Sequence, residues 1–162
     1  MARQYGIDSP RARRAMTTAF RCVVDASVAI KQFIRDPLSE KTIELFALLV
    51  EPETEFLVPD LFYIEMANIL WKYLRAGQLT ARQVQEALTF LEGYPLWVFS
   101  TVPLMREAVN LGIAYNLTAY DGSYVALAKR LDAPLLTLDR KLFEALATSS
   151  LAVFWFDDFP IP

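Results

Sequence analysis

The chain has 162 residues, of which 54% are hydrophobic and 22% charged, a composition typical of one globular domain. No apolar run approaches the roughly 20 residues of a membrane-spanning helix, and no basic head with an apolar stretch near Met1 predicts a secretory signal. The single cysteine, Cys22, cannot form an internal disulfide. We therefore expect a protein without membrane contact in a reducing, cytoplasmic setting.

The sequence contains no histidine. This excludes the Ser-His-Asp and Cys-His nucleophile systems, and one cysteine is too few for a thiolate zinc site. Nineteen Asp and Glu residues remain, and oxygen ligands of this kind select hard cations such as Mg²⁺ or Mn²⁺. An enzyme of this composition has to use carboxylates, lysine, tyrosine, hydroxyls or a metal.

Charge divides the chain into two parts. The first 21 residues carry five arginines against Asp8, a balance of +4 that leaves −7 on the remainder of a chain whose net charge is −3. Residues 1–19 also lack periodicity, so we expect a flexible basic extension there and a single domain over residues 20–162. A domain this acidic is not held on nucleic acid by bulk phosphate neutralisation, and it would need a local site or a bound cation.

From Phe20 onward, short apolar strands alternate with helical patterns. In chain order the patterns predict strand 20–24, helices 27–33 and 38–50, strand 56–58, helices 60–75 and 80–92, strand 97–99, helices 103–115 and 121–131, strand 134–138, helix 140–147 and strand 151–155. Continuous rather than alternating apolar strands are covered on both faces. The sequence therefore predicts an α/β three-layer α/β/α sandwich with a central, mostly parallel sheet of about five strands.

Capping residues support several of these helices. Ser39 is the expected N-cap of helix 38–50, whose apolar face we expect to include Ile43 and Val50. Asp60 is the expected cap of helix 60–75, which Gly77 ends, and Thr80 caps the next helix.

Four acids lie where a parallel α/β sheet binds its ligands, beyond strand ends or near helix starts. Asp25 follows the first strand and Asp139 the fourth, while Asp121 lies three residues after Thr118. Each of these three has an alternative role as a helix cap or as part of a capping box. Glu65 is the one acid in an otherwise apolar helical stretch. Converging carboxylates repel one another, and a divalent cation would relieve that repulsion.

Helical spacing places Glu65, Asn68, Lys72 and Arg75 on one stripe of helix 60–75. One interpretation is an ordinary solvated face. The other is the wall of a cleft, with Glu65 at its deep end and Lys72 nearer its mouth.

The ordered motifs Val23–Ser27, Tyr63–Asn68, Thr118–Ala128 and Leu136–Asp139 resemble the PIN-domain family, with the VapC-type toxins of toxin–antitoxin pairs as the most similar branch. The resemblance covers about residues 20–158, and the four acids stand 40, 56 and 18 residues apart. It implies a PIN-like sandwich that acts as a Mg²⁺- or Mn²⁺-dependent endoribonuclease, the toxin of a type II pair. It further implies an RNA substrate, a cognate antitoxin protein and a homodimer.

The resemblance also assigns residues. It implies that the acids hold the metal and carry catalysis, that hydroxyls lie near the metal and that Asn68 supports the site. The acids are Asp25, Glu65, Asp121 and Asp139, and the hydroxyl residues are Ser27 and Thr137. Candidate phosphate contacts are Lys31, Arg35, Lys72, Arg140 and Lys141, for each of which a solvated surface role is the alternative. Gly122 follows Asp121 where alanine is more usual, which is expected to loosen that helix start.

Two other function classes compete with the nuclease. A PIN-like module without catalysis would use its exposed aromatics for a partner, although the intact acids argue against a purely structural role. An aspartyl-phosphate phosphotransfer protein would need a second acid two residues after the first, or an acidic pair. Asp25 is followed by Ala26 and Ser27, so the first of these patterns is absent.

Overall fold

The computed structural model describes residues 3–5 and 20–162. Within them, six strands form one parallel sheet in the order β1-β4-β3-β2-β5-β6. The strands are β1 (Arg3–Tyr5), β2 (Arg21–Val24), β3 (Glu55–Pro59), β4 (Trp97–Phe99), β5 (Leu135–Thr137) and β6 (Val153–Trp155). Because all neighbouring pairs are parallel, the strand carboxyl ends share one edge of the sheet, and the segments leaving that edge can meet.

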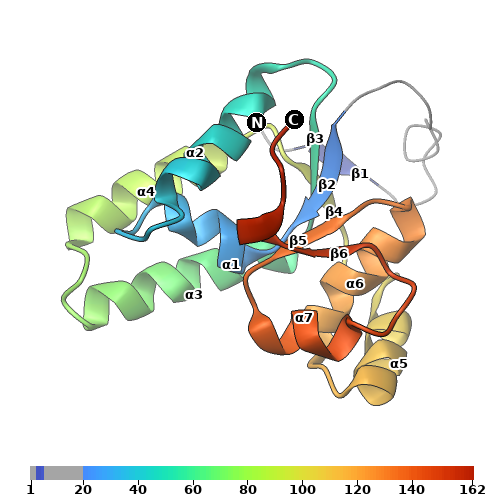
Figure 1. Ribbon diagram of the computed structural model, residues 1–162. Helices are drawn as coiled ribbons and strands as arrows, with labels where there is room; N and C mark the ends of the chain where they lie inside the picture. The colour runs from blue at the N-terminus through green and yellow to red at the C-terminus, as the bar shows by residue number, and fades with distance from the viewer. Residues whose placement is uncertain (1–2, 6–19) are drawn as a thin grey trace.

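Helices cover the sheet on both sides, with α1 to α4 on one side and α5 to α7 on the other (Figure 1). The helices are α1 (Ala26–Ala29), α2 (Ser39–Ala47), α3 (Leu61–Arg75), α4 (Ala81–Gly93), α5 (Met105–Tyr115), α6 (Ala119–Leu131) and α7 (Arg140–Leu146), and the 3₁₀ turns are η1 (Ile30–Gln32), η2 (Leu48–Val50) and η3 (Phe156–Asp158). This arrangement confirms the predicted three-layer α/β sandwich. The predicted helices 27–33 and 38–50 each end in a 3₁₀ turn.

The core lies along the central strands. Residues Cys22, Val23 and Val24 of β2 have no exposed surface, and neither do residues Phe56–Val58 of β3. Runs of this kind are buried on both faces, as the continuous apolar pattern predicted. Burial also raises the pKa of the Cys22 thiol, which keeps this lone cysteine in its inert, protonated form.

Several helix boundaries follow directly from local chemistry. Thr80 and Gln83 form a reciprocal capping box at the start of α4. Gly77 takes the left-handed conformation, with φ of +70°, directly after α3 ends. Asp60 occupies the N-cap position of α3 but does not cap it, because its Oδ1 accepts a hydrogen bond from Thr101 N instead.

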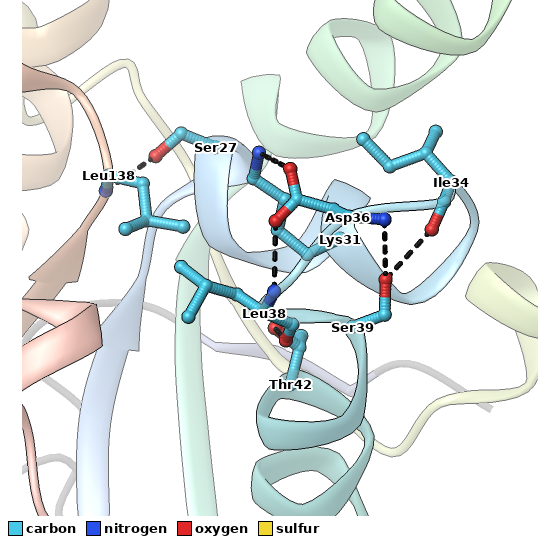
Figure 2. A network of polar contacts seen from close by, with 8 residues as sticks. All are labelled: Ser27, Lys31, Ile34, Asp36, Leu38, Ser39, Thr42 and Leu138. Atoms are coloured by element: carbon cyan, nitrogen blue, oxygen red, sulfur yellow. Dashed lines mark hydrogen bonds and ion pairs between the residues drawn. The ribbon is translucent and has the colours of Figure 1, made fainter.

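Two expectations for α2 were wrong. Ser39 is its first helical residue rather than its cap, and the Ser39 hydroxyl donates to Ile34 O and accepts from Asp36 N to close the preceding loop (Figure 2). Ile43 and Val50 are exposed rather than buried. The final turn tightens into η2, and this change of helical period moves Val50 off the buried face, whereas Ile43 lies on the exposed side of α2 itself.

The expected extension over residues 1–19 contains one element that the sequence did not predict. Arg3–Tyr5 forms β1, which pairs with β4 at the edge of the sheet, with Gln4 opposite Val98. The other residues of the extension lie outside the described part of the chain. In the part that the structure describes, no helix is both long and apolar enough to cross a bilayer.

Candidate functional site

Asp25 lies directly after β2 and is almost fully buried. Two hydroxyls donate to its Oδ2, from Ser27 at 2.6 Å and from Thr137 at 2.6 Å. The same hydroxyls accept backbone N–H groups, Ser27 from Leu138 and Thr137 from Asp139, each at 2.9 Å (Figure 2 shows the Ser27 contact). Their protons are thereby directed at the carboxylate, whose position is fixed by the exit of β5 as well as by β2.

Burial dominates the electrostatics of Asp25. It raises the carboxyl pKa because the charged form loses water, and the nearby charge of Asp121 raises it further. Hydrogen bonds from Ser27 and Thr137 lower the pKa without cancelling these effects. The folded protein therefore keeps a carboxylate here at an electrostatic cost.

Glu65 is half-buried on the second turn of α3. Burial, and after it the charges of Asp25 and Asp121, raise its pKa to about 7, although a hydrogen bond from the Tyr124 hydroxyl lowers it. The charges of Asp25 and Asp121 therefore act on Glu65 from nearby.

Asp121 begins α6 as part of a hydrogen-bonded cap. Its N–H donates to the Thr118 hydroxyl at 3.1 Å, and that hydroxyl donates to Asp121 Oδ2 at 2.7 Å. The capping role and electrostatic proximity to Asp25 and Glu65 thus coexist in one residue. Behind it, Gly122 packs so closely on α5 that an added Cβ would lie 2.4 Å from the Ala108 carbonyl oxygen. The close contact between α6 and α5 therefore explains a glycine at this position.

Asp139 is the N-cap of α7, because its Oδ1 accepts from Leu142 N at 3.0 Å. Its own N–H donates to Thr137, the residue that also bonds Asp25. Asp139 is therefore connected to Asp25 through the Thr137 side chain, and it also caps α7.

The four acids carry no ion pair with any lysine or arginine in the described part of the chain. Across residues 3–5 and 20–162, no three His, Cys, Asp or Glu side chains form a ready-made metal-binding group. The donor chemistry nevertheless fits a hard divalent cation. Asp25, Glu65 and Asp121 offer oxygen ligands only, and the charge of Asp121 raises the pKa of both Asp25 and Glu65.

A cleft of about 560 Å³ opens beside Glu65. Its lining residues are Ile64, Glu65, Ala67, Asn68, Trp71 and Tyr120. The predicted stripe is therefore half right, since Glu65 and Asn68 line the cleft whereas Lys72 and Arg75 do not. Helical steps of three and four residues from Ile64 reach Ala67 and Trp71, which also line the cleft. This spacing is the sequence pattern that could have indicated the cleft.

The candidate phosphate contacts differ in their surroundings. Lys31 is held by Asp36 in a partly buried ion pair (Figure 2), and Arg140 contacts both Glu144 and the Trp155 ring. Among these candidates, three are exposed and form no ion pair with a described residue: Arg35, Lys72 and Lys141.

Fold and site together define an α/β domain with an acidic edge, and residues 22–148 match the family model described as PIN domain. The chain belongs to the PIN domain family. It is 35% identical to Ribonuclease VapC3 of Pyrobaculum aerophilum over 133 residues, which cover 79% of this chain and 98% of that protein. It is 32% identical to Ribonuclease VapC1 of Mycobacterium tuberculosis, over 76% of this chain and 90% of that protein.

Solved structures show the same fold. VapBC2 from Rickettsia felis, bound to a promoter DNA fragment, superposes with a TM-score of 0.60 at 12% identity and covers 84% of this chain and 99% of that one. FitAcB from Neisseria gonorrhoeae gives 0.59 at 17% identity, over 85% and 99%.

Proposed function

We propose that this protein is a metal-dependent endoribonuclease, the toxin of a type II toxin–antitoxin pair, that hydrolyses RNA phosphodiesters. One observation carries the proposal. At the carboxyl edge of the sheet, the charge of Asp121 raises the pKa of both Asp25 and Glu65, and none of these three acids has a basic partner among the described residues. Repulsion of this kind is retained where a cation is to be bound.

Asp25, Asp121 and Asp139 would be the main ligands of Mg²⁺ or Mn²⁺, and Glu65 would either join them or act as a base. The bound cation supplies a more acidic water and neutralises charge on the phosphate. Ser27 and Thr137 fix the Asp25 carboxylate through Oδ2. As a base, the ionised Glu65 carboxylate would orient the attacking water and accept its proton. Asn68 lines the adjoining cleft and supports the site there.

The partners follow from the relatives. Ribonuclease VapC3 and Ribonuclease VapC1 are named for RNA cleavage, and a neighbour from Klebsiella pneumoniae is described as a toxin–antitoxin complex. An antitoxin protein and an RNA substrate are therefore proposed for this chain, together with a homodimeric state. Arg35, Lys72 and Lys141 remain candidates for phosphate contact, since they are exposed.

Incubation of the purified protein with RNA tests the proposal. Cleavage is expected with Mg²⁺ or Mn²⁺ and is expected to stop in excess EDTA. Asp25→Asn should reduce cleavage to background while circular dichroism shows a folded protein. A matched control is Glu53→Gln, which changes an exposed acid ahead of β3, at the opposite edge of the sheet, and should leave cleavage intact.

Full activity in EDTA would refute the metal dependence, and full activity of Asp25→Asn would refute the role of Asp25 in the site. If a metal-loaded sample cleaves no RNA of any kind, the chain is instead a PIN-fold module that binds a partner.

A further inference from the structure

The cleft beside Glu65 has two exposed aromatic rings, and nothing in the acidic site requires them. Trp71 of α3 is 49% exposed, and Tyr120 at the start of α6 is 65% exposed. Neither ring packs against another aromatic ring in the described part of the chain. Large rings left open to water in a concave site are suited to stacking on a flat ligand.

Charged and polar groups border these rings. The Arg75 guanidinium carbon lies 4.9 Å from the centroid of the Trp71 ring, so a positive charge is held against the aromatic surface. Asn68 brings an amide that can both donate and accept hydrogen bonds. Glu65 lines the cleft and Tyr120, which also lines it, directly precedes Asp121, so the cleft adjoins the acidic site.

An unpaired nucleobase with its phosphate matches this combination. A base has a flat π surface for Trp71 and Tyr120 and polar edges for Asn68, while its phosphate is attracted to Arg75. We propose that this cleft binds an unpaired base of single-stranded RNA next to the phosphate that is cleaved, with Trp71 and Tyr120 as its stacking surfaces. The proposal rests on the proposed function and deepens it.

A second copy of the chain is the other conceivable occupant. Ile64 in the cleft and Val109 and Ile113 on α5 are exposed and apolar. Val109 and Ile113 do not line the cleft, however, and the cleft itself contains Glu65 and Asn68. Burying those groups against an apolar surface is unfavourable without new hydrogen bonds, so the observations favour a polar, flat ligand.

Binding measurements separate these possibilities. We would measure the anisotropy of a short fluorescent single-stranded RNA with the full chain in EDTA, so that no cleavage occurs. Trp71→Ala and Tyr120→Ala should each weaken binding about tenfold, whereas Trp71→Phe retains a ring and should restore most of the affinity. A fully paired RNA duplex should respond much less. Phe90→Ala is the matched control, since that exposed ring lies in a separate groove with Ile43.

Unchanged single-stranded RNA affinity in Trp71→Ala and Tyr120→Ala would overturn the proposal. A shift from dimer to monomer in sedimentation, with RNA affinity unchanged, would also overturn it and assign the face to self-association. If the wild type cleaves RNA with metal but the cleft variants bind normally, only the cleft proposal fails. If the wild type never cleaves yet the variants lose binding, the proposed catalysis fails and the base-binding cleft stands.

Discussion

The hydroxyl of Tyr124 donates a 2.5 Å hydrogen bond to Oε2 of Glu65, across a sequence separation of 59 residues. It joins α6 to α3, on opposite sides of the sheet layer that carries Asp25 (Figure 1). Burial, followed by the charges of Asp25 and Glu65, raises the pKa of Tyr124 well above its ordinary value. The phenol therefore stays protonated and acts as a fixed donor that orients the Glu65 carboxylate.

Tyr124→Phe should remove the hydrogen bond to Glu65 while its ring still fills the same place in the core. The ring remains, but Glu65 loses the bond that favours its charged form, so its pKa should rise above about 7 and cleavage should require higher pH. The stability cost should be about 1 kcal/mol. Rate–pH profiles and urea unfolding measure the two effects.

Tyr63→Phe is the matched control for that variant. The Tyr63 hydroxyl is buried and has no hydrogen-bond partner among the described residues, so its removal should be neutral or slightly stabilising and leave the pH profile unchanged. An unchanged profile in Tyr124→Phe as well would contradict the orienting role of Tyr124.

Glu65 should make the metal-free protein less stable as pH rises. Its pKa is about 7 when folded and 4.5 ordinarily, so between these values the folded state binds more protons than the unfolded state. The contribution of this group to the free energy of unfolding is therefore fully present below about pH 4.5, and it is lost as pH rises through about 7. Urea unfolding in EDTA should show a smaller decline from pH 5 to pH 8 for Glu65→Gln than for the wild type. Equal declines would show that Glu65 does not titrate in this range.

The sequence predicts the acids of the site better than their supports. Asp25 and Asp139 follow from strand ends, and Asp121 from its spacing to Thr118, because each depends on local order along the chain. The Tyr124–Glu65 bond depends on how α6 packs relative to α3, which no local pattern encodes. The sequence could not place Trp71 in the cleft, because a tryptophan in an amphipathic helix is ordinarily part of the core.

Edge pairing and changes of helical period could not be predicted from the sequence either. Three residues, Arg3–Tyr5, become a strand only because β4 offers an open edge. Val50 fits an ideal α-helical face with Leu45 and Phe46, but the turn from Leu48 to Val50 is 3₁₀ and leaves it exposed. In both cases tertiary contacts decided what sequence periodicity left open.

Thr137→Val should damage the Asp25 site more than its small change in shape suggests. Thr137 is fully buried, and its hydroxyl donates to Asp25 and accepts from Asp139 N. The variant therefore removes one of the two hydroxyl donors to Asp25 Oδ2 and leaves Asp139 N without its acceptor. We expect a loss of about 1–3 kcal/mol in the free energy of unfolding and strongly reduced cleavage, with Thr137→Ser close to wild type.

Thr42→Val provides the comparison, because Thr42 is also fully buried but bonds only Leu38 O within α2. Its loss should be smaller, and cleavage should persist. Chemical denaturation and a cleavage assay on the same samples measure both. Equal effects at Thr42 and Thr137 would argue that burial alone, and not the Asp25 network, explains the cost.

Gly122→Ala should separate α5 from α6 and displace Asp121. The added Cβ would meet the Ala108 backbone oxygen at 2.4 Å, and a backbone atom cannot move aside as a flexible side chain can. Overpacking of this kind costs about 1–3 kcal/mol, and it should weaken Mn²⁺ binding measured by calorimetry. Gly93→Ala is the matched control, since nothing lies within 4 Å of its added Cβ and its φ is not left-handed. There the reduced freedom of the unfolded chain should leave stability unchanged or higher, so a destabilised Gly93→Ala beside an undisturbed Gly122→Ala would contradict the close α5–α6 contact.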